Sequence, residues 1–206
     1  AEQGVQDPMV LGAMGTIERH RFVDTALAGQ AYEDTSLPIG LGQTISKPGV
    51  VSRMIELLRN GQTGKLGRVL EIGTGCGYQA ALLGHLSRRV VSIERLRDLH
   101  LKARANLDTL RQHLPEWPDV RLVYGDGMIG HAPLAPYDTI IAAAGGASLP
   151  QAWIDQLAPG GRLVAPLEEG RAGTQVLTIL DRLPDGSLQH SRAGAVLFVP
   201  LKSGTT

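Results

Sequence analysis

The stretch LEIGTGCGYQ, residues 70–79, decides the fold. Its first residues complete a short apolar strand pattern, and YQAALLGHL at 78–86 continues with a helical one. Gly73, Gly75 and Gly77 lie between the two patterns. Glycine adopts positive φ angles easily and lets a ligand approach a backbone that carries no Cβ. Because open α/β sheets bind ligands at the carboxyl ends of their strands, this stretch predicts a ligand-binding loop.

Downstream of this stretch, short apolar runs alternate with helical patterns. We expect strands at 68–73, 89–94, 120–125, 137–144 and 160–166, and helices at 78–86, 96–113 and 150–158. Continuous apolar strands separated by helices are typical of a parallel sheet covered on both faces. Two more strand patterns, TQVLTILDR at 174–182 and AGAVLFVPL at 193–201, have no helix between them and predict an antiparallel edge.

Upstream, helical patterns cover 9–28 and 50–58, and SLPIGLGQTISKP at 36–48 has neither helix nor strand periodicity. No repeat or linker divides the chain, so we expect one α/β domain over 1–206. Its parts are N-terminal helices with the irregular loop at 1–60, a ligand-binding core at 66–166 and C-terminal strands at 174–201.

The charge balance gives no sign of a polyanionic partner. Lys plus Arg number 20 and Asp plus Glu number 20, whereas nucleic-acid phosphates require clustered cations. No apolar run approaches the roughly 18 residues of a membrane span, and AEQGVQDPMV lacks the pattern of a secretory signal. We therefore expect no nucleic-acid and no membrane partner. Nothing in the sequence demands an oligomer, so we expect a monomer.

The single cysteine, Cys76, excludes a disulfide framework and favours a cytoplasmic protein. The six histidines have no metal-ligand spacing with Cys76 or with one another. We therefore expect no metal site.

The spacing of the glycine loop limits what it binds. Dinucleotide loops have glycine at the first, third and sixth positions, but here the sixth position is Tyr78. The G-x-G-x-G pattern fits a small nucleoside cofactor without a phosphate better than a pyrophosphate. The alternative is a plain strand-to-helix turn, which rarely needs three alternating glycines.

Two acidic residues end the neighbouring strand patterns. Glu94 ends the second strand, where a carboxylate can accept hydrogen bonds from both hydroxyls of a ribose. Asp126, followed by Gly127, ends the third and can accept a hydrogen bond from an adenine amino group. The alternatives are a solvated carboxylate at a strand end for Glu94 and a turn for the Asp-Gly pair. Together with the glycine loop and LAPGGRLV at 157–164, the two acidic residues resemble the class I S-adenosylmethionine-dependent methyltransferases.

Methyl transfer from a sulfonium mainly requires alignment of the acceptor. An amine acceptor would favour an Asn-Pro-Pro-Tyr-like motif after the fourth strand, where this chain has IIAAAGGAS. A carboxylate is already ionised at neutral pH, because its pKa is about 4, and needs only hydrogen-bond donors. Thr44 and Ser46 can supply hydroxyl donors, and the apolar side chains that close over the site are Leu37, Ile39 and Ile45. The alternative is that Ser46 merely caps the following helix.

SLPIGLGQTISKP, VLEIGTGCGYQAALL, VSIER, GDG, YDTIIAAA, APGGRLV and FVPL occur in this order, and IERHRFV precedes them. From about residue 9 to 201 the chain resembles the protein-L-isoaspartate O-methyltransferase family. The resemblance implies a doubly wound, mostly parallel, seven-stranded sheet with an antiparallel edge. It also implies transfer of a methyl group from S-adenosyl-L-methionine to the α-carboxylate of L-isoaspartyl residues in damaged proteins, with S-adenosyl-L-homocysteine as product.

By position, Ser46 matches the family's active-site serine. The resemblance implies cofactor contacts for Gln43, Thr44, Ile45, Glu71, Gly73, Thr74, Gly75, Cys76, Gly77, Glu94, Arg95, Asp126 and Gly127. The chain departs from the family pattern at Lys47, Gly49 and Gly145–Gly146, which affects how the loop packs and how it grips the substrate's flanks. Cys76 replaces a frequent serine; we interpret it as a small residue near the cofactor, since no histidine has an evident place beside it.

Three rival hypotheses remain. A nicotinamide-dependent oxidoreductase would share the fold, although Tyr78 at the sixth loop position disfavours it. A methyltransferase for another small molecule or for RNA would share the cofactor loop. A non-enzymatic cofactor-binding domain would keep the loop without catalysis, and Gly49 keeps that hypothesis open.

Overall fold

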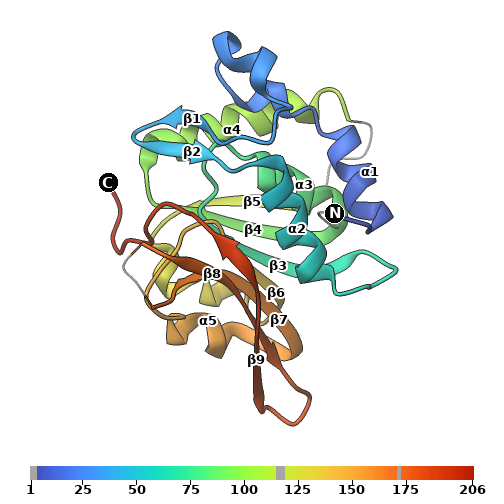
Figure 1. Cartoon of the computed structure of the whole chain (residues 1–206), viewed down its shortest axis with the longest axis vertical. Helices are drawn as coiled ribbons and strands as arrows, with labels where there is room; N and C mark the ends of the chain where they lie inside the picture. The colour runs from blue at the N-terminus through green and yellow to red at the C-terminus, as the bar shows by residue number, and fades with distance from the viewer. Residues whose placement is uncertain (1–3, 115–118, 171–172) are drawn as a thin grey trace.

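The computed structural model describes residues 4–114, 119–170 and 173–206. Within them a seven-stranded sheet has the order β5-β4-β3-β6-β7-β8-β9, as Figure 1 shows. The strands are β3 (Leu66–Ile72), β4 (Ser87–Glu94), β5 (Asp119–Tyr124), β6 (Tyr137–Ala142), β7 (Leu157–Glu168), β8 (Gln175–Arg182) and β9 (Leu188–Val196). Strands β3 to β7 pair in parallel, and β8 and β9 are antiparallel. The predicted doubly wound sheet with an antiparallel edge is confirmed.

Helices cover both faces of this sheet (Figure 1). The α-helices are α1 (Pro8–Thr16), α2 (Pro48–Arg59), α3 (Tyr78–Leu86), α4 (Arg97–Arg111) and α5 (Gln151–Gln156). Short 3-10 helices are η1 (Arg19–Phe22), η2 (Thr25–Gln30), η3 (Gly127–Ile129) and η4 (Ala132–Leu134). In the described part of the chain, none of these helices combines the length and the hydropathy that crossing a membrane requires.

The hydrophobic core forms two clusters, one on each face of the sheet. Val69 and Val90 point to the cluster beneath α1 to α4, and Leu70 and Val91 point to the cluster against α5 and its Trp153. Successive strand residues face opposite sides, so a sheet covered on both faces needs apolar residues at every position. This explains the continuous apolar runs in the sequence.

The predicted helix over 9–28 is wrong beyond Thr16, where α1 ends. The chain becomes extended at Ile17 and then forms η1 and η2. Arg19 is buried there, and its Nε donates to the carbonyl oxygen of Ala31 at 2.7 Å. Its guanidinium also lies over the Tyr78 ring, 5.2 Å from the ring centre. A single straight helix would not bring Arg19 to these partners, and the apolar pattern alone does not reveal them.

The stretch at 36–48, predicted as irregular, instead contains an antiparallel hairpin. Its strands are β1 (Leu37–Gly40) and β2 (Gln43–Ile45), which pair with each other and not with the main sheet. Leu37 and Ile39 are buried, whereas Pro38 and Gly40 are exposed. This alternation is typical of a strand, but it spans too few residues to stand out among prolines and glycines. We call residues 37–45 the hairpin.

The predicted last strand, 193–201, is also misplaced, because β9 ends at Val196. The segment after β9 leaves the sheet edge, where Phe198 is hydrogen-bonded to the Gln175 side chain. Gln175 Oε1 accepts from the Phe198 N–H at 2.7 Å, and Gln175 Nε2 donates to the Phe198 carbonyl at 3.2 Å. Residues 197–206, which we call the tail, then pass beside Gly145, whose N–H donates to the Val199 carbonyl at 2.8 Å. The tail thereby reaches the carboxyl ends of the parallel strands.

Candidate active site

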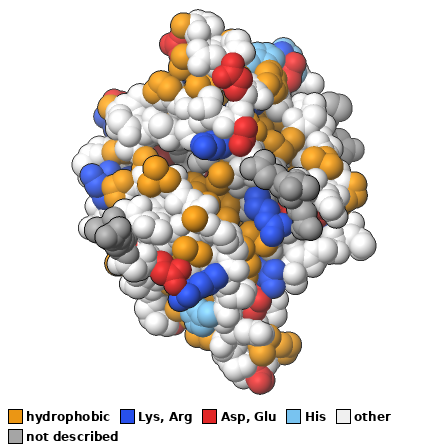
Figure 2. Space-filling model, viewed as in Figure 1, with side chains coloured by type: hydrophobic (Ala, Val, Ile, Leu, Met, Phe, Trp, Pro, Cys, Tyr) orange, Lys and Arg blue, Asp and Glu red, His pale blue; other side chains and the backbone are white. Residues whose placement is uncertain are grey.

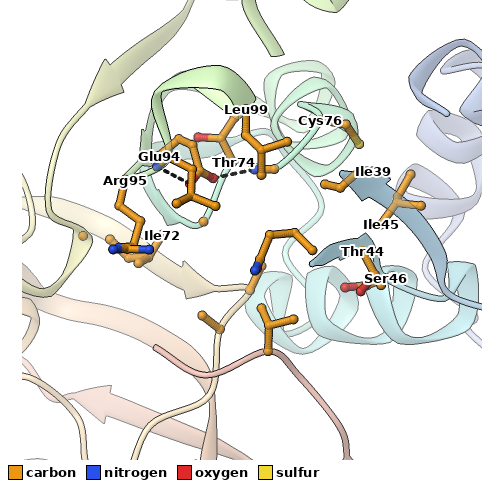
Figure 3. A pocket seen from close by; sticks show the side chains of 18 of the residues that line it. Ile39, Thr44, Ile45, Ser46, Ile72, Thr74, Cys76, Glu94, Arg95 and Leu99 are labelled. Carbon is orange, nitrogen blue, oxygen red and sulfur yellow. Dashed lines mark hydrogen bonds between the residues drawn. The ribbon is translucent and has the colours of Figure 1, made fainter. Parts of the chain in front are cut away.

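A cavity of ≈ 510 Å³ lies at the carboxyl ends of β3, β4 and β6, between the hairpin and the tail (Figure 3). This volume is typical of a small-molecule site. Its wall contains these predicted residues: Gln43, Thr44, Ile45, Ser46, Gly73, Thr74, Gly75, Cys76, Glu94, Arg95 and Gly127. Glu71, Gly77 and Asp126 are predicted site residues that lie outside the wall.

The glycine loop has the backbone conformation that its sequence predicts. Gly73, Gly75 and Gly77 have φ angles of 88°, 57° and 92°, which L side chains rarely adopt. A Cβ on Gly75 would lie 3.2 Å from Ile39 Cδ1, so the hairpin packs directly on the loop. A Cβ on Gly77 would lie 3.4 Å from Ala103 Cβ in α4. Gly73 and Gly75 therefore form the wall, and Gly77 lets α4 pack behind it.

Glu94 braces the glycine loop from the end of β4. Its Oε2 accepts from the Gly75 N–H and its Oε1 from the Leu96 N–H, both at 2.9 Å. The residue is only 5% exposed, yet it lines the cavity. Each carboxylate oxygen accepts more than one hydrogen bond, so Glu94 retains capacity for a ligand hydroxyl.

Glu71 lies behind the loop, where it is fully buried. Its Oε1 accepts from Gln79 Nε2 at 3.0 Å, and its Oε2 is hydrogen-bonded to the Ser92 hydroxyl, which also contacts the Thr74 hydroxyl. Burial raises the pKa of Glu71 to about 8, opposed by the hydrogen bonds from Ser92 and Gln79, with the charge of Glu94 as a smaller cause. At neutral pH the carboxyl group is therefore mostly protonated, and it connects the core to the loop through Ser92 and Thr74.

Asp126 is engaged by backbone groups. Its Oδ1 accepts from the Met128 N–H at 2.8 Å, and its Oδ2 accepts from the Gly204 N–H of the tail at 2.7 Å. Gly127 alone of the pair lies in the wall. A Cβ there would lie 2.5 Å from Ile72 Cγ2, so only glycine fits against β3 at this point.

Ser46 and Thr44 project from the hairpin end, across the cavity from Glu94 and Arg95 (Figure 3). Helix α2 has Lys47 as its N-cap without a side-chain hydrogen bond, so the alternative that Ser46 caps this helix is wrong. The hydrogen bonds among the described residues include none from the Ser46 hydroxyl. This hydroxyl is therefore available to a ligand in the cavity.

The Asp34 carboxylate explains why glycine occupies position 49. The Gly49 N–H, in the first turn of α2, donates to Asp34 Oδ1 at 2.8 Å. A Cβ on Gly49 would lie 2.9 Å from the same oxygen. Asp34 thus satisfies a free N–H at the start of the helix that follows Ser46, and a side chain at position 49 would displace it.

Cys76 lies in the cavity wall, but only 3% of its surface is exposed. Burial raises the pKa of its thiol to about 11, so the thiol is protonated at neutral pH. Since the thiolate is the nucleophile, this environment suits a packing role. Across residues 4–114, 119–170 and 173–206, the His, Cys, Asp and Glu side chains form no group of three that could hold a metal ion.

The wall also contains residues that the sequence reasoning missed. They include Leu41 at the hairpin turn, Leu96 and Leu99 at the start of α4, and Val199, Pro200, Leu201 and Lys202 of the tail. The apolar run FVPL was visible in the sequence but was assigned to a strand. The helical pattern predicts only a core position for Leu96 and Leu99, but their place directly after the strand that ends at Glu94 is the signal that puts them at the strand tips.

The chain matches over residues 1–206 the family described as protein-L-isoaspartate(D-aspartate) O-methyltransferase. A protein-L-isoaspartate O-methyltransferase of Methylibium petroleiphilum is 65% identical over 204 residues, which cover 98% of this chain and 74% of the relative. One from Leptothrix cholodnii is 61% identical over 204 residues, which cover 98% of this chain and 70% of the relative.

Two solved structures share the fold over nearly the whole chain. A Plasmodium falciparum protein described as a protein-L-isoaspartate O-methyltransferase, in complex with S-adenosyl-L-homocysteine, has a TM-score of 0.82 and 25% identity, covering 96% of this chain and 92% of its own. Another structure described as protein-L-isoaspartate O-methyltransferase has a TM-score of 0.83 and 28% identity, covering 97% of this chain and 62% of its own.

Proposed function

The chain belongs to the protein-L-isoaspartate(D-aspartate) O-methyltransferase family, and on this premise we propose that it methylates the α-carboxylate of L-isoaspartyl residues in damaged proteins. The observation that carries the proposal is that the glycine loop and the hydroxyl-bearing hairpin line one cavity. A cofactor on the loop and an acceptor beneath the hairpin would therefore meet in a single space. The methyl ester would then cyclise to a succinimide as the following backbone nitrogen displaces methanol, and water opens the succinimide in part to normal aspartate.

The residues of the wall fit S-adenosyl-L-methionine. Gly73 and Gly75 offer backbone without Cβ atoms, Glu94 offers carboxylate lone pairs for a ribose, and Ile72 and Gly127 form an apolar part of the wall for a flat ring. The cofactor, when bound, supplies an electrophilic methyl group on a sulfonium and leaves as S-adenosyl-L-homocysteine. No phosphate-binding helix start is needed, since this cofactor has no phosphate.

The acceptor side needs orientation more than activation. A carboxylate with a pKa near 4 is ionised at neutral pH, so no general base has to remove a proton. We assign the Ser46 hydroxyl to donate a hydrogen bond to the carboxylate oxygen that does not react, with Thr44 beside it. A neutral donor orients the carboxylate without drawing as much charge from it as a bidentate arginine would. Ile39 and Ile45, both buried, keep water from the space between loop and hairpin.

We also propose that the acceptors are proteins and peptides of the cytoplasm, and that the chain acts as a monomer. Equal numbers of cationic and anionic side chains, 20 of each, support a neutral polypeptide partner over nucleic acid or an anionic membrane. The single buried cysteine supports a reducing compartment.

The test uses two peptides that are identical except for isoaspartate or aspartate at one position. With methyl-labelled S-adenosyl-L-methionine, base-labile label is expected on the isoaspartyl peptide only, because esters of carboxylates hydrolyse in base. Label on both peptides would indicate a less selective carboxyl methyltransferase. Label on neither, with tight S-adenosyl-L-homocysteine binding, would indicate a different acceptor and refute the proposal.

A further inference from the structure

Leu41, at the turn of the hairpin, has an unfavourable backbone conformation. Its φ angle is 53°, and it stands in the chain between Gly40 and Gly42, whose φ angles are 103° and 68°. Leucine rarely adopts this region, and a hairpin turn is formed with less strain by Asn or Gly. The side chain is also 57% exposed, so the fold gains little from burying it. Strain retained in this way points to a role outside folding.

The surroundings fix Leu41 in place. Gln43 Nε2 donates to the Leu41 carbonyl at 3.3 Å, and Lys102 Nζ from α4 donates to the Ile39 carbonyl at 2.9 Å. Ile39 in turn packs on Gly75 of the glycine loop. The hairpin turn is therefore held on the cofactor loop, and its apolar side chain is displayed at a defined point of the cavity wall.

The tail forms the opposite side of the opening. Pro200 and Lys202 of the tail are exposed residues of the same wall. Figure 2 shows hydrophobic side chains gathered around a hollow in the middle of this face. An isoaspartyl residue remains part of a polypeptide, so the chain on either side of it has to leave the cavity through this opening. At least one neighbouring residue therefore passes the hairpin turn.

We propose that Leu41 is a specificity-determining residue that contacts an apolar side chain adjacent to the isoaspartyl residue of the substrate. This inference rests on the proposed function. It explains why an exposed leucine occupies a left-handed turn position, since removing an apolar substrate side chain from water against Leu41 stabilises the bound state. The part of the opening beside Leu41 thus binds an apolar residue of the substrate polypeptide.

The test uses isoaspartyl peptides in two series, with Leu, Ala or Lys immediately before or immediately after the isoaspartyl residue. The wild-type protein should show a kcat/KM about tenfold higher for Leu than for Lys in one series, the scale of a modest apolar contact. Leu41→Gly should lose this preference while its melting temperature stays close to that of the wild type, because glycine adopts the same φ without strain and this gain offsets the higher entropy of its unfolded chain. Leu41→Glu should reverse the preference towards the Lys peptide.

Leu11→Glu is the matched control, because Leu11 is 51% exposed on α1 and lies outside the cavity wall. It should keep the wild-type ratio. The inference is overturned if the wild type shows no preference in either series, or if both Leu41 variants keep its ratio. The Ala peptides test the proposed function separately from the role of Leu41. Methylation of the isoaspartyl Ala peptide but not of its aspartyl counterpart supports the proposed function, whatever the kcat/KM ratio of the Leu and Lys peptides. Absence of that methylation overturns the proposed function and this inference together.

Discussion

The carboxyl group of Glu71 lies fully buried behind the glycine loop. Its pKa rises from 4.5 to about 8, chiefly through burial. Between these values the folded protein keeps a proton that the unfolded chain has lost. The contribution of Glu71 to stability is therefore fully present below 4.5 and is lost as the pH rises through about 8. Within this window the slope approaches about 1.4 kcal/mol per pH unit.

We predict that Glu71→Gln removes most of this slope. Glutamine is neutral at every pH and keeps both hydrogen bonds, since its oxygen can accept from Gln79 and its amide can donate to Ser92. Urea unfolding at a series of pH values measures the effect, with exposed Asp108→Asn as the control. A variant that retains the wild-type slope would show that another group causes it.

Glu94 accepts two backbone hydrogen bonds in addition to its proposed contact with the ribose. Glu94→Gln therefore tests the bracing of the glycine loop and the ribose contact together. The amide would place an NH₂ group against either the Gly75 or the Leu96 N–H, leaving one of them without an acceptor. We expect the Kd for S-adenosyl-L-homocysteine to rise about tenfold or more, given the strength of hydrogen bonds to a charged group. Calorimetry measures it, with exposed Asp98→Asn on α4 as the control. Unchanged affinity would eliminate the ribose role of Glu94.

For single residues, the sequence predicts whether a side chain lies at the cavity better than it predicts the hydrogen-bond partners of that side chain. Gly73, Gly75 and Glu94 could be placed at the cavity because strand ends are local features of the sequence. The partners of Glu71 and Asp126 could not, because Ser92 and Gly204 come from distant parts of the chain. Without these partners, both acidic residues look like direct ligand contacts.

Among the elements, the tail has a larger role than its sequence indicates. The Thr206 N–H donates to the Arg95 carbonyl at 3.0 Å, the Arg97 N–H donates to the Thr206 carbonyl at 2.8 Å, and Arg95 Nε donates to the Gly204 carbonyl at 2.9 Å. With the Gly204 bond to Asp126, these contacts fix the tail over the ends of β4 and β5. The tail thus closes one side of the cavity.

We predict that deleting residues 203–206 weakens S-adenosyl-L-homocysteine binding and accelerates its release. The seven-stranded sheet should remain, since β9 already ends at Val196. Stopped-flow release and circular dichroism measure the two properties. Gly204→Pro, which removes one N–H and is incompatible with the φ of 72° there, should act in the same direction. Equal release rates in all three proteins would mean that the tail does not retain the cofactor.

The elements predicted correctly are those with long periodic patterns. Helix α3 was predicted with its observed bounds, and the strands of the core were placed to within a few residues. The errors fall on the 9–28 region, the hairpin and the last strand. There, single tertiary contacts decide the backbone: Arg19 with Ala31, Ile39 on Gly75, and Gln175 with Phe198. Such contacts leave no periodic signal.

On the scale of the whole molecule, the three parts of the chain share one core. The cluster beneath α1 to α4 includes Val10 and Met54 from the N-terminal part, Val69 from the parallel strands, and Leu177 and Phe198 from the C-terminal part. We therefore predict one cooperative unfolding transition, as expected of a single domain. No part can separate without exposing the same cluster.

Thermal unfolding followed by circular dichroism and by tryptophan fluorescence should give coincident curves, because Trp153 is buried in the second core cluster. S-adenosyl-L-homocysteine should shift both curves together, since it stabilises only the folded state. Two separate transitions, with only one shifted by the ligand, would divide the chain into two domains.

The central claim is that one cavity brings a cofactor on the glycine loop to an acceptor held by Ser46, which directly follows the hairpin. The most direct measurement compares Ser46→Ala with the wild type in isoaspartyl-peptide turnover and in S-adenosyl-L-homocysteine affinity, on the same preparations. We predict a fall in kcat of about a hundredfold, the scale of loss when a reacting group is misplaced by about 1 Å, with the Kd within about twofold. Equal losses in both quantities, or no loss of turnover, would contradict the claim.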